Sequence, residues 1–107
     1  MIEDLKDKSK AIADICSRYR VSKLEVFGSA ARETDYSPGR SDIDFAVEFE
    51  SMTPGMHFDA YIDLAEALEE LLGRPVELVE LGSAKNPYFL NSVLADKQVL
   101  YVAPVIP

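Results

Sequence analysis

Two aspartates separated by a single residue, Asp42 and Asp44, are the side chains of this sequence best suited to bind a metal. They begin the segment DIDFAVEF, which alternates polar and apolar positions as a half-buried strand does. Residues two apart on a strand leave the same face, so the pattern predicts both carboxylates side by side. Two adjacent negative charges are costly unless a cation lies between them. Such hard oxygen ligands suit Mg²⁺ that also binds substrate phosphates.

A glycine-serine pair, Gly28-Ser29, follows an apolar run and precedes a predicted helical turn. Glycine lets the backbone approach a ligand closely, and free amides at a helix start favour phosphate. Ser29 adds a hydroxyl donor, and Arg32 lies one turn further on. Arg40 is a weaker candidate for contact with a triphosphate. Each feature alone is common in turns and solvated strands. Their combination with Asp42 and Asp44 indicates a site for Mg²⁺ and a nucleoside triphosphate.

The remaining sequence predicts the elements that would position these groups. Apolar residues at helical spacing predict helices over residues 3–19, 58–72 and 87–97, with a single turn at 29–33 and Asn86 as a possible N-cap. Alternation and β-branched residues predict strands over residues 23–28, 42–49 and 76–81, and a last strand or an extended tail over residues 98–103. Residues 34–41 and 50–56 are expected to form loops. The order predicts an α/β fold, a small mixed β-sheet with helices packed on it, in one domain spanning residues 1–107.

The charge balance limits the classes of partner. The chain has 19 acidic and 11 basic residues, a net charge of −8, which disfavours direct DNA or RNA binding. An acidic row on the predicted helix 58–72 forms either a solvated face or a surface for a basic partner; it comprises Asp59, Asp63, Glu66 and Glu70. No apolar run approaches the roughly 20 residues of a membrane span, and no signal peptide is expected. The single cysteine, Cys16, fits a cytoplasmic location and a packing role.

The block GSAAR…SDIDFAVEF resembles the signature of the DNA polymerase β-like nucleotidyltransferases, and the small chain resembles their minimal nucleotidyltransferase (MNT) branch. The resemblance implies that Gly28 and Ser29 contact nucleotide phosphates. It also implies that Asp42 and Asp44 bind two divalent metals, with a third carboxylate at Glu77 that helps to activate the attacking hydroxyl. MNT proteins resemble antitoxins paired with HEPN-type RNase toxins, and some transfer AMP to a tyrosine of the toxin. ATP and a HEPN partner are therefore expected.

Two departures from the family pattern leave an alternative open. The spacer between Ser29 and Asp42 has 12 residues, longer than expected, which enlarges the loop around residues 36–40. Position 77 holds glutamate where the family has aspartate, and transfer geometry is sensitive to shifts near 1 Å. The alternative interpretation of Glu77 is a solvent-exposed strand residue that alternates with Glu80 and takes no part in the reaction. The alternative is an impaired enzyme that neutralises a toxin by contact alone. Transfer to a small molecule or RNA is a third, weaker hypothesis.

Overall fold

The computed structural model describes residues 1–33 and 42–104, and within these it forms a mixed, four-stranded sheet. The strands are β1 (Val21–Phe27), β2 (Ile43–Phe49), β3 (Val76–Val79) and β4 (Gln98–Val102), in the spatial order β3-β2-β1-β4. β1 pairs antiparallel with both β2 and β4, whereas β2 pairs in parallel with β3. The predicted mixed sheet is confirmed, and β3 and β4 are its two edges.

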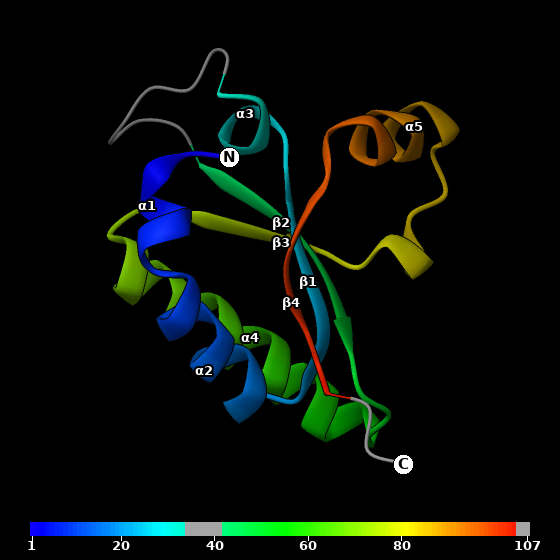
Figure 1. The fold of residues 1–107 in the computed structure, drawn as a ribbon. Coiled ribbons are helices and arrows are strands. Elements are labelled where there is room, and N and C mark those ends of the chain that lie inside the picture. The colour runs from blue at the N-terminus through cyan, green and yellow to red at the C-terminus, as the bar shows by residue number, and fades with distance from the viewer. Residues whose placement is uncertain (34–41, 105–107) are drawn as a thin grey trace.

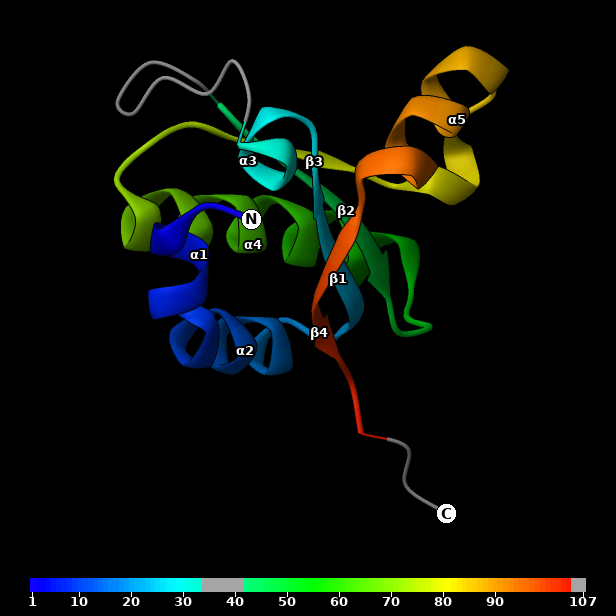
Figure 2. The same ribbon diagram turned by 45° about the horizontal axis from the view of Figure 1, so that its top comes forward.

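The helices lie on both sides of this sheet (Figures 1 and 2). α1 (Glu3–Asp7), α2 (Ser9–Arg18) and the long α4 (Pro54–Leu72) lie on one side. α5 (Pro87–Asp96) packs on the other, and the short α3 (Ser29–Arg32) lies at the end of β1. No helix in the described part of the chain is both long and apolar enough to cross a membrane.

The alternation of β2 explains why the two faces differ. Ile43, Phe45 and Val47 are buried in the larger core, against apolar side chains of α2 and α4 such as Ile12, Leu64 and Leu68. Ala46 turns the other way and joins a smaller cluster with Phe27 and Val93 of α5. Asp44 shares the parity of Ala46, so it projects from the smaller face. The large core thereby fixes the strand that carries Asp44.

The predicted helix over residues 3–19 is wrong in one respect, because the structure divides it into α1 and α2 at Lys8. The positions that would continue the apolar stripe after Leu5 are Lys8 and Ser9, both polar, so no apolar contact favours a continuous helix there. The Lys8 ammonium group instead donates to the carbonyl of Leu71 near the end of α4, at 3.3 Å. Through this hydrogen bond, the residue between α1 and α2 connects the N-terminal helices to the end of α4.

Two further boundaries differ from the prediction. The predicted loop over residues 50–56 is wrong for its second half, because α4 already begins at Pro54. The Thr53 hydroxyl accepts a hydrogen bond from the Met56 amide and so caps the helix. Proline suits the first helical position, so it starts this helix rather than preventing it. The third strand ends at Val79 instead of residue 81, and a 3₁₀ turn covers Leu81–Ser83. The predicted N-cap of α5 is confirmed, because the Asn86 side chain accepts hydrogen bonds from the amides of Tyr88 and Phe89.

Candidate functional site

The first element of the site is the close approach between Gly28 and Asp44. Phe27, the last residue of β1, is the cross-strand partner of Asp44, so the chain turns at Gly28 directly beside this carboxylate. Gly28 has φ +71°, and a Cβ atom built on it would lie 2.6 Å from Oδ2 of Asp44. Both the backbone conformation and the available space therefore require glycine. The Gly28 turn and the Asp44 carboxylate therefore lie directly against each other.

The second element is a pair of carboxylates from adjacent strands. Asp44 and Glu77 are register partners in the parallel β2–β3 ladder, so their side chains leave the same face of the sheet. Burial raises the pKa of Asp44 to about 6 from an ordinary 3.8, assisted by the negative charge of Glu77 and a hydrogen bond to it. The charge of Asp42 raises this pKa further, and that of Arg32 lowers it. The charged form of Asp44 is thus disfavoured by burial and by the negative charges around it.

Asp42 lies just before β2, and it is exposed. Its influence on the pKa of Asp44 places its charge in the same electrostatic environment. Within residues 1–33 and 42–104, however, no three aspartate, glutamate, histidine or cysteine side chains are already gathered as a set of metal ligands. Asp44 and Glu77 thus form a pair, with Asp42 outside it. Arg40 and the rest of the predicted loop 34–41 lie outside the described residues.

α3 supplies the nitrogen donors of the site. The amides of Ala31 and Arg32 donate to the Gly28 carbonyl, which forms the first helical turn. The preceding amides, those of Ser29 and Ala30, come too early in the helix for an intrahelical acceptor. Such amides at a helix start, together with the Ser29 hydroxyl, are suited to donating hydrogen bonds to phosphate oxygens. They lie directly after the glycine that touches Asp44.

Sequence reasoning missed Asp96, the last residue of α5. Its carboxylate forms an ion pair and a hydrogen bond with the guanidinium group of Arg32, which is 64 residues away in the chain. The contact holds the end of α5 against α3 and fixes Arg32 near the Gly28 turn. An acidic residue at the end of a predicted helix carries no spacing signal that would have indicated this pairing.

Three further titratable residues have local roles in the structure. His57 contributes neither a metal cluster nor the cap of α4; its Nε2 atom lies 2.6 Å from Oε1 of Glu80. Cys16 is fully buried, which confirms its packing role, and burial raises the pKa of its thiol to about 12. Glu25 is a buried carboxylate on β1, with the Lys97 ammonium 3.3 Å away. These groups stabilise the scaffold around the site.

The donor set fits a divalent cation of the Mg²⁺ kind. Asp42, Asp44 and Glu77 offer only carboxylate oxygens, the ligand type that Mg²⁺ prefers. Burial is the main cause of the raised pKa of Asp44, and a cation beside it would offset both this burial and the repulsion from Glu77 and Asp42. The Asp44–Glu77 pair therefore lies beside the Gly28 turn that opens α3, an arrangement with the chemistry to hold a metal-bound polyphosphate.

Comparison with known proteins agrees with this arrangement. Residues 10–104 match the family described as "Polymerase beta, Nucleotidyltransferase", and the chain belongs to this family of nucleotidyltransferases. Within it, the chain resembles the minimal branch. It is 36% identical over 101 residues to the protein adenylyltransferase MJ0128 of Methanocaldococcus jannaschii, covering 94% of each chain. It is 36% identical over 89 residues to the protein adenylyltransferase MntA of Thermococcus cleftensis, covering 83% of this chain and 82% of the relative.

Solved structures share the fold. A structure described as a minimal nucleotidyltransferase superimposes with a TM-score of 0.71 at 31% identity, covering 90% of this chain and 92% of the other. A structure described as a toxin-antitoxin with AMP-PNP superimposes with a TM-score of 0.64 at 23% identity, covering 89% of this chain and 73% of the other. The expected nucleotidyltransferase fold is therefore confirmed.

Proposed function

We propose that this nucleotidyltransferase transfers AMP from ATP, with Mg²⁺, to a hydroxyl group of a partner protein. The observation that carries the proposal is the facing arrangement of the Gly28-Ser29 turn and the Asp44–Glu77 pair. The named relatives are protein adenylyltransferases, which supports AMP as the transferred group and a protein as its acceptor. The fold is shared with a toxin-antitoxin structure, which supports a toxin as the partner. By the family resemblance, we propose a HEPN-type toxin and an antitoxin role.

The residues would divide the work as follows. The Ser29 and Ala30 amides, the Ser29 hydroxyl and Arg32 would bind the triphosphate of ATP. Asp42 and Asp44 would hold Mg²⁺, with Glu77 as a further ligand on the side of the acceptor. Two such ions would screen the charge that develops on the entering and leaving oxygens. The sequence spacing, the register of β2 and β3 and the charge at Asp44 support these assignments.

The proposed transfer is a displacement at the α-phosphorus of ATP. The acceptor hydroxyl oxygen forms a bond to this phosphorus, and the bond from the α-phosphorus to the oxygen that bridges to the β-phosphorus breaks. Pyrophosphate leaves, and the hydroxyl proton passes to the carboxylate of Glu77. Because Glu77 is exposed on the edge strand β3, an acceptor from another protein can approach it from solvent. The product is a protein carrying AMP in a phosphodiester link.

Binding and transfer can be tested separately. Calorimetry should show ATP binding that depends on Mg²⁺ and disappears in Asp42→Ala/Asp44→Ala. ATP labelled at the α-phosphorus should label the proposed HEPN-type partner when it is co-purified with this chain. Glu77→Gln should nearly abolish labelling, since a lost charge at the reacting centre removes several kcal/mol of transition-state stabilisation. Glu77→Asp should retain or raise the rate. Equal labelling by the wild type and Glu77→Gln would remove Glu77 from the reaction.

One observation favours a second candidate function. Position 77 holds glutamate where the family resemblance implies aspartate, and the longer side chain changes the geometry available for transfer, which an antitoxin that acts by contact alone would tolerate. This binding module would hold its toxin tightly without modifying it. Tight complex formation by the wild-type protein, with no labelling under either Mg²⁺ or Mn²⁺, would select this function over transfer.

A further inference from the structure

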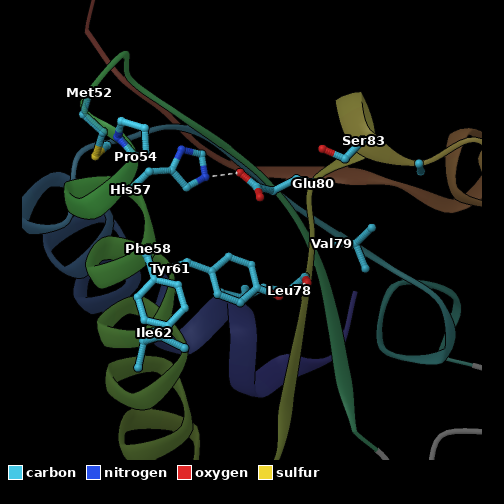
Figure 3. A pocket seen from close by; sticks show the side chains of 11 residues that line it. Met52, Pro54, His57, Phe58, Tyr61, Ile62, Leu78, Val79, Glu80 and Ser83 are labelled. Atoms are coloured by element: carbon cyan, nitrogen blue, oxygen red, sulfur yellow. Dashed lines mark hydrogen bonds and ion pairs between the residues drawn. The ribbon is translucent and has the colours of Figure 1, made fainter.

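An apolar groove lies beside the site, along the free edge of the sheet. The N-terminal half of α4 forms one wall and β3 with the following 3₁₀ turn forms the other, and the volume between them is about 850 Å³ (Figure 3). Phe58, Tyr61 and Ile62 line the helical wall, and Leu78 and Glu80 line the strand wall. We call this feature the α4–β3 groove.

The outer wall of the groove is unusually apolar for a surface. Phe58 is 66% exposed and Ile62 is 40% exposed, one helical turn apart on the same side of α4. Met56 nearby is 45% exposed. Exposed apolar side chains that gather at a hollow indicate a binding surface more often than isolated ones do. The groove is therefore large and apolar enough to receive side chains of another molecule.

Polar contacts hold the walls of the groove in place. The Tyr61 hydroxyl donates to the Leu78 carbonyl at 2.6 Å, and burial, with the charges of Glu80 and Glu77, raises the pKa of this hydroxyl. Across the groove, His57 contacts Glu80, as the dashed line in Figure 3 shows. Because α4 and β3 are joined at two points, the hollow is a feature of the rigid fold. Little ordering is then required when a ligand binds.

The same contacts decide which kind of segment fits. A strand added to β3 would need the outward backbone groups of that edge. The Leu78 carbonyl is already occupied by Tyr61, and the Val76 amide donates to the Glu69 carboxylate at 3.4 Å. Addition of a strand is therefore disfavoured. A helix or loop that inserts apolar side chains between Phe58 and Leu78 needs none of these groups.

The charge around the groove decides which partner fits. Glu80 lines it, exposed Glu66 lies one turn beyond Ile62 on α4, and the residues described as lining it include no lysine or arginine. Exposed Asp59 lies further round α4, where it lines a second hollow with Arg18 and Arg20. A second copy of this chain, with a net charge of −8, would bring acidic surfaces together. A basic segment would instead meet complementary charge at the rim and apolar surface at the centre.

Glu77 links the groove to the reaction. It lies on β3 directly before Leu78 and its side chain leaves the opposite face of the sheet, yet its charge is among those that raise the pKa of the Tyr61 hydroxyl in the groove. Only the exposed edge of β3 therefore separates the groove from the carboxylate pair. We infer that the α4–β3 groove docks the acceptor protein, through a basic helix or loop with apolar anchors, and that a neighbouring part of the acceptor passes the edge of β3 to present its hydroxyl to Glu77 and Asp44. This inference rests on the proposed function for the identity of the acceptor, whereas docking itself can be measured without transfer.

The test uses the full chain co-expressed with a HEPN-type protein, the partner that the proposed function names. Phe58→Asp/Ile62→Asp should weaken the complex at least tenfold, because it places charge at the apolar centre, while Mg²⁺-dependent ATP binding persists and shows that the fold is intact. Phe58→Leu should bind nearly as well as the wild type. Val102→Asp is the matched control, since Val102 is 58% exposed on the opposite edge strand β4. It should leave binding unchanged.

Charge reversal tests the chemistry of the occupant. Asp59→Lys/Glu66→Lys should weaken the complex, and added salt should weaken the wild-type complex in parallel. Stronger or unchanged binding by this variant would overturn the inference that the docked segment is basic. If the wild-type chain alone self-associates and Phe58→Asp/Ile62→Asp abolishes that association, the occupant is a second copy and the inference is overturned.

The outcomes separate docking from transfer. Undiminished complex formation by Phe58→Asp/Ile62→Asp would overturn the groove as the docking site, whether or not AMP is transferred. A complex that depends on the groove but acquires no label would retain the docking site and overturn the transfer. If both hold, the double variant should raise the KM for the acceptor while leaving kcat at saturating acceptor unchanged. The absence of any complex with the wild-type chain would also overturn the docking site.

Discussion

The carboxylate pair should reduce the stability of the metal-free protein, and Asp44→Asn should relieve this effect. The Asp44 pKa of about 6 means that the folded chain binds this proton more tightly than an unfolded chain, in which the pKa is near 3.8. Between these pH values the folded state gains a proton and is stabilised as the pH falls. Above pH 6 the cost of holding this half-buried charge beside Glu77 and Asp42 is fully present. Asparagine removes that charge while keeping nearly the same shape.

The size of the effect follows from the shift. About two pKa units would correspond to about 3 kcal/mol in a fully buried site. Asp44 is only half-buried, so solvent screening reduces this to about 1 kcal/mol. For a chain of this size, about 1 kcal/mol raises Tm by about 5 °C. Asp44→Asn should therefore melt about 5 °C above the wild type at pH 8, and the difference should vanish near pH 4.

Calorimetric melting in EDTA across this pH range measures the prediction. Asp14→Asn is a suitable control, because Asp14 is exposed on α2 and the change removes the same unit of charge away from the site. Addition of Mg²⁺ and ATP should reverse the order, since a ligand at 100 times its Kd stabilises the wild type by about 2.7 kcal/mol. A difference between wild type and Asp44→Asn that is constant from pH 4 to pH 8, or reproduced by Asp14→Asn, would refute the electrostatic argument.

Three further predictions concern the surroundings of the pair. Gly28→Ala should lose Mg²⁺-dependent ATP binding in calorimetry, because its Cβ would displace the Asp44 carboxylate; normal binding would contradict the close contact. Asp96→Asn should weaken ATP binding several-fold by releasing Arg32, and the double variant with Arg32→Ala should be no weaker than Arg32→Ala alone; additive losses would contradict this coupling. The Cys16 thiol, with its pKa raised to about 12, should react with a thiol reagent at pH 8 only after unfolding, so rapid labelling of the folded chain would contradict its burial.

The sequence predicts the strand that carries the aspartates because its two faces have different chemistry. Ile43 and Phe45 face the larger core and Asp44 faces away, which is a period-2 pattern visible in the residue order. The mixed sheet and the chain order of its strands follow from similar local patterns. The boundaries at Lys8 and Pro54 do not, because tertiary contact and capping decide them.

Contacts between side chains that are far apart in the sequence are harder to predict from the sequence than the strands and helices are. The proximity of Glu77 to Asp44 depends on the β2–β3 register, which the resemblance to a family suggested and periodicity alone could not. The pairing of Arg32 with Asp96 and that of Tyr61 with the Leu78 carbonyl have no signal in residue spacing. The groove is likewise formed by two segments whose separate patterns indicate only a helix and a strand.

The side chains that α4 places along β3 also affect how the folded protein behaves at high concentration. A free sheet edge is a template on which strands of other molecules can add and begin an aggregate. On β3, Tyr61 and Glu69 already occupy the Leu78 carbonyl and the Val76 amide, which obstructs growth of the sheet in that direction. β4 is the opposite edge, and its Val99 and Val102 are more than half exposed. Colloidal association of the native fold is therefore expected to begin at β4, and the β3 edge is protected from it.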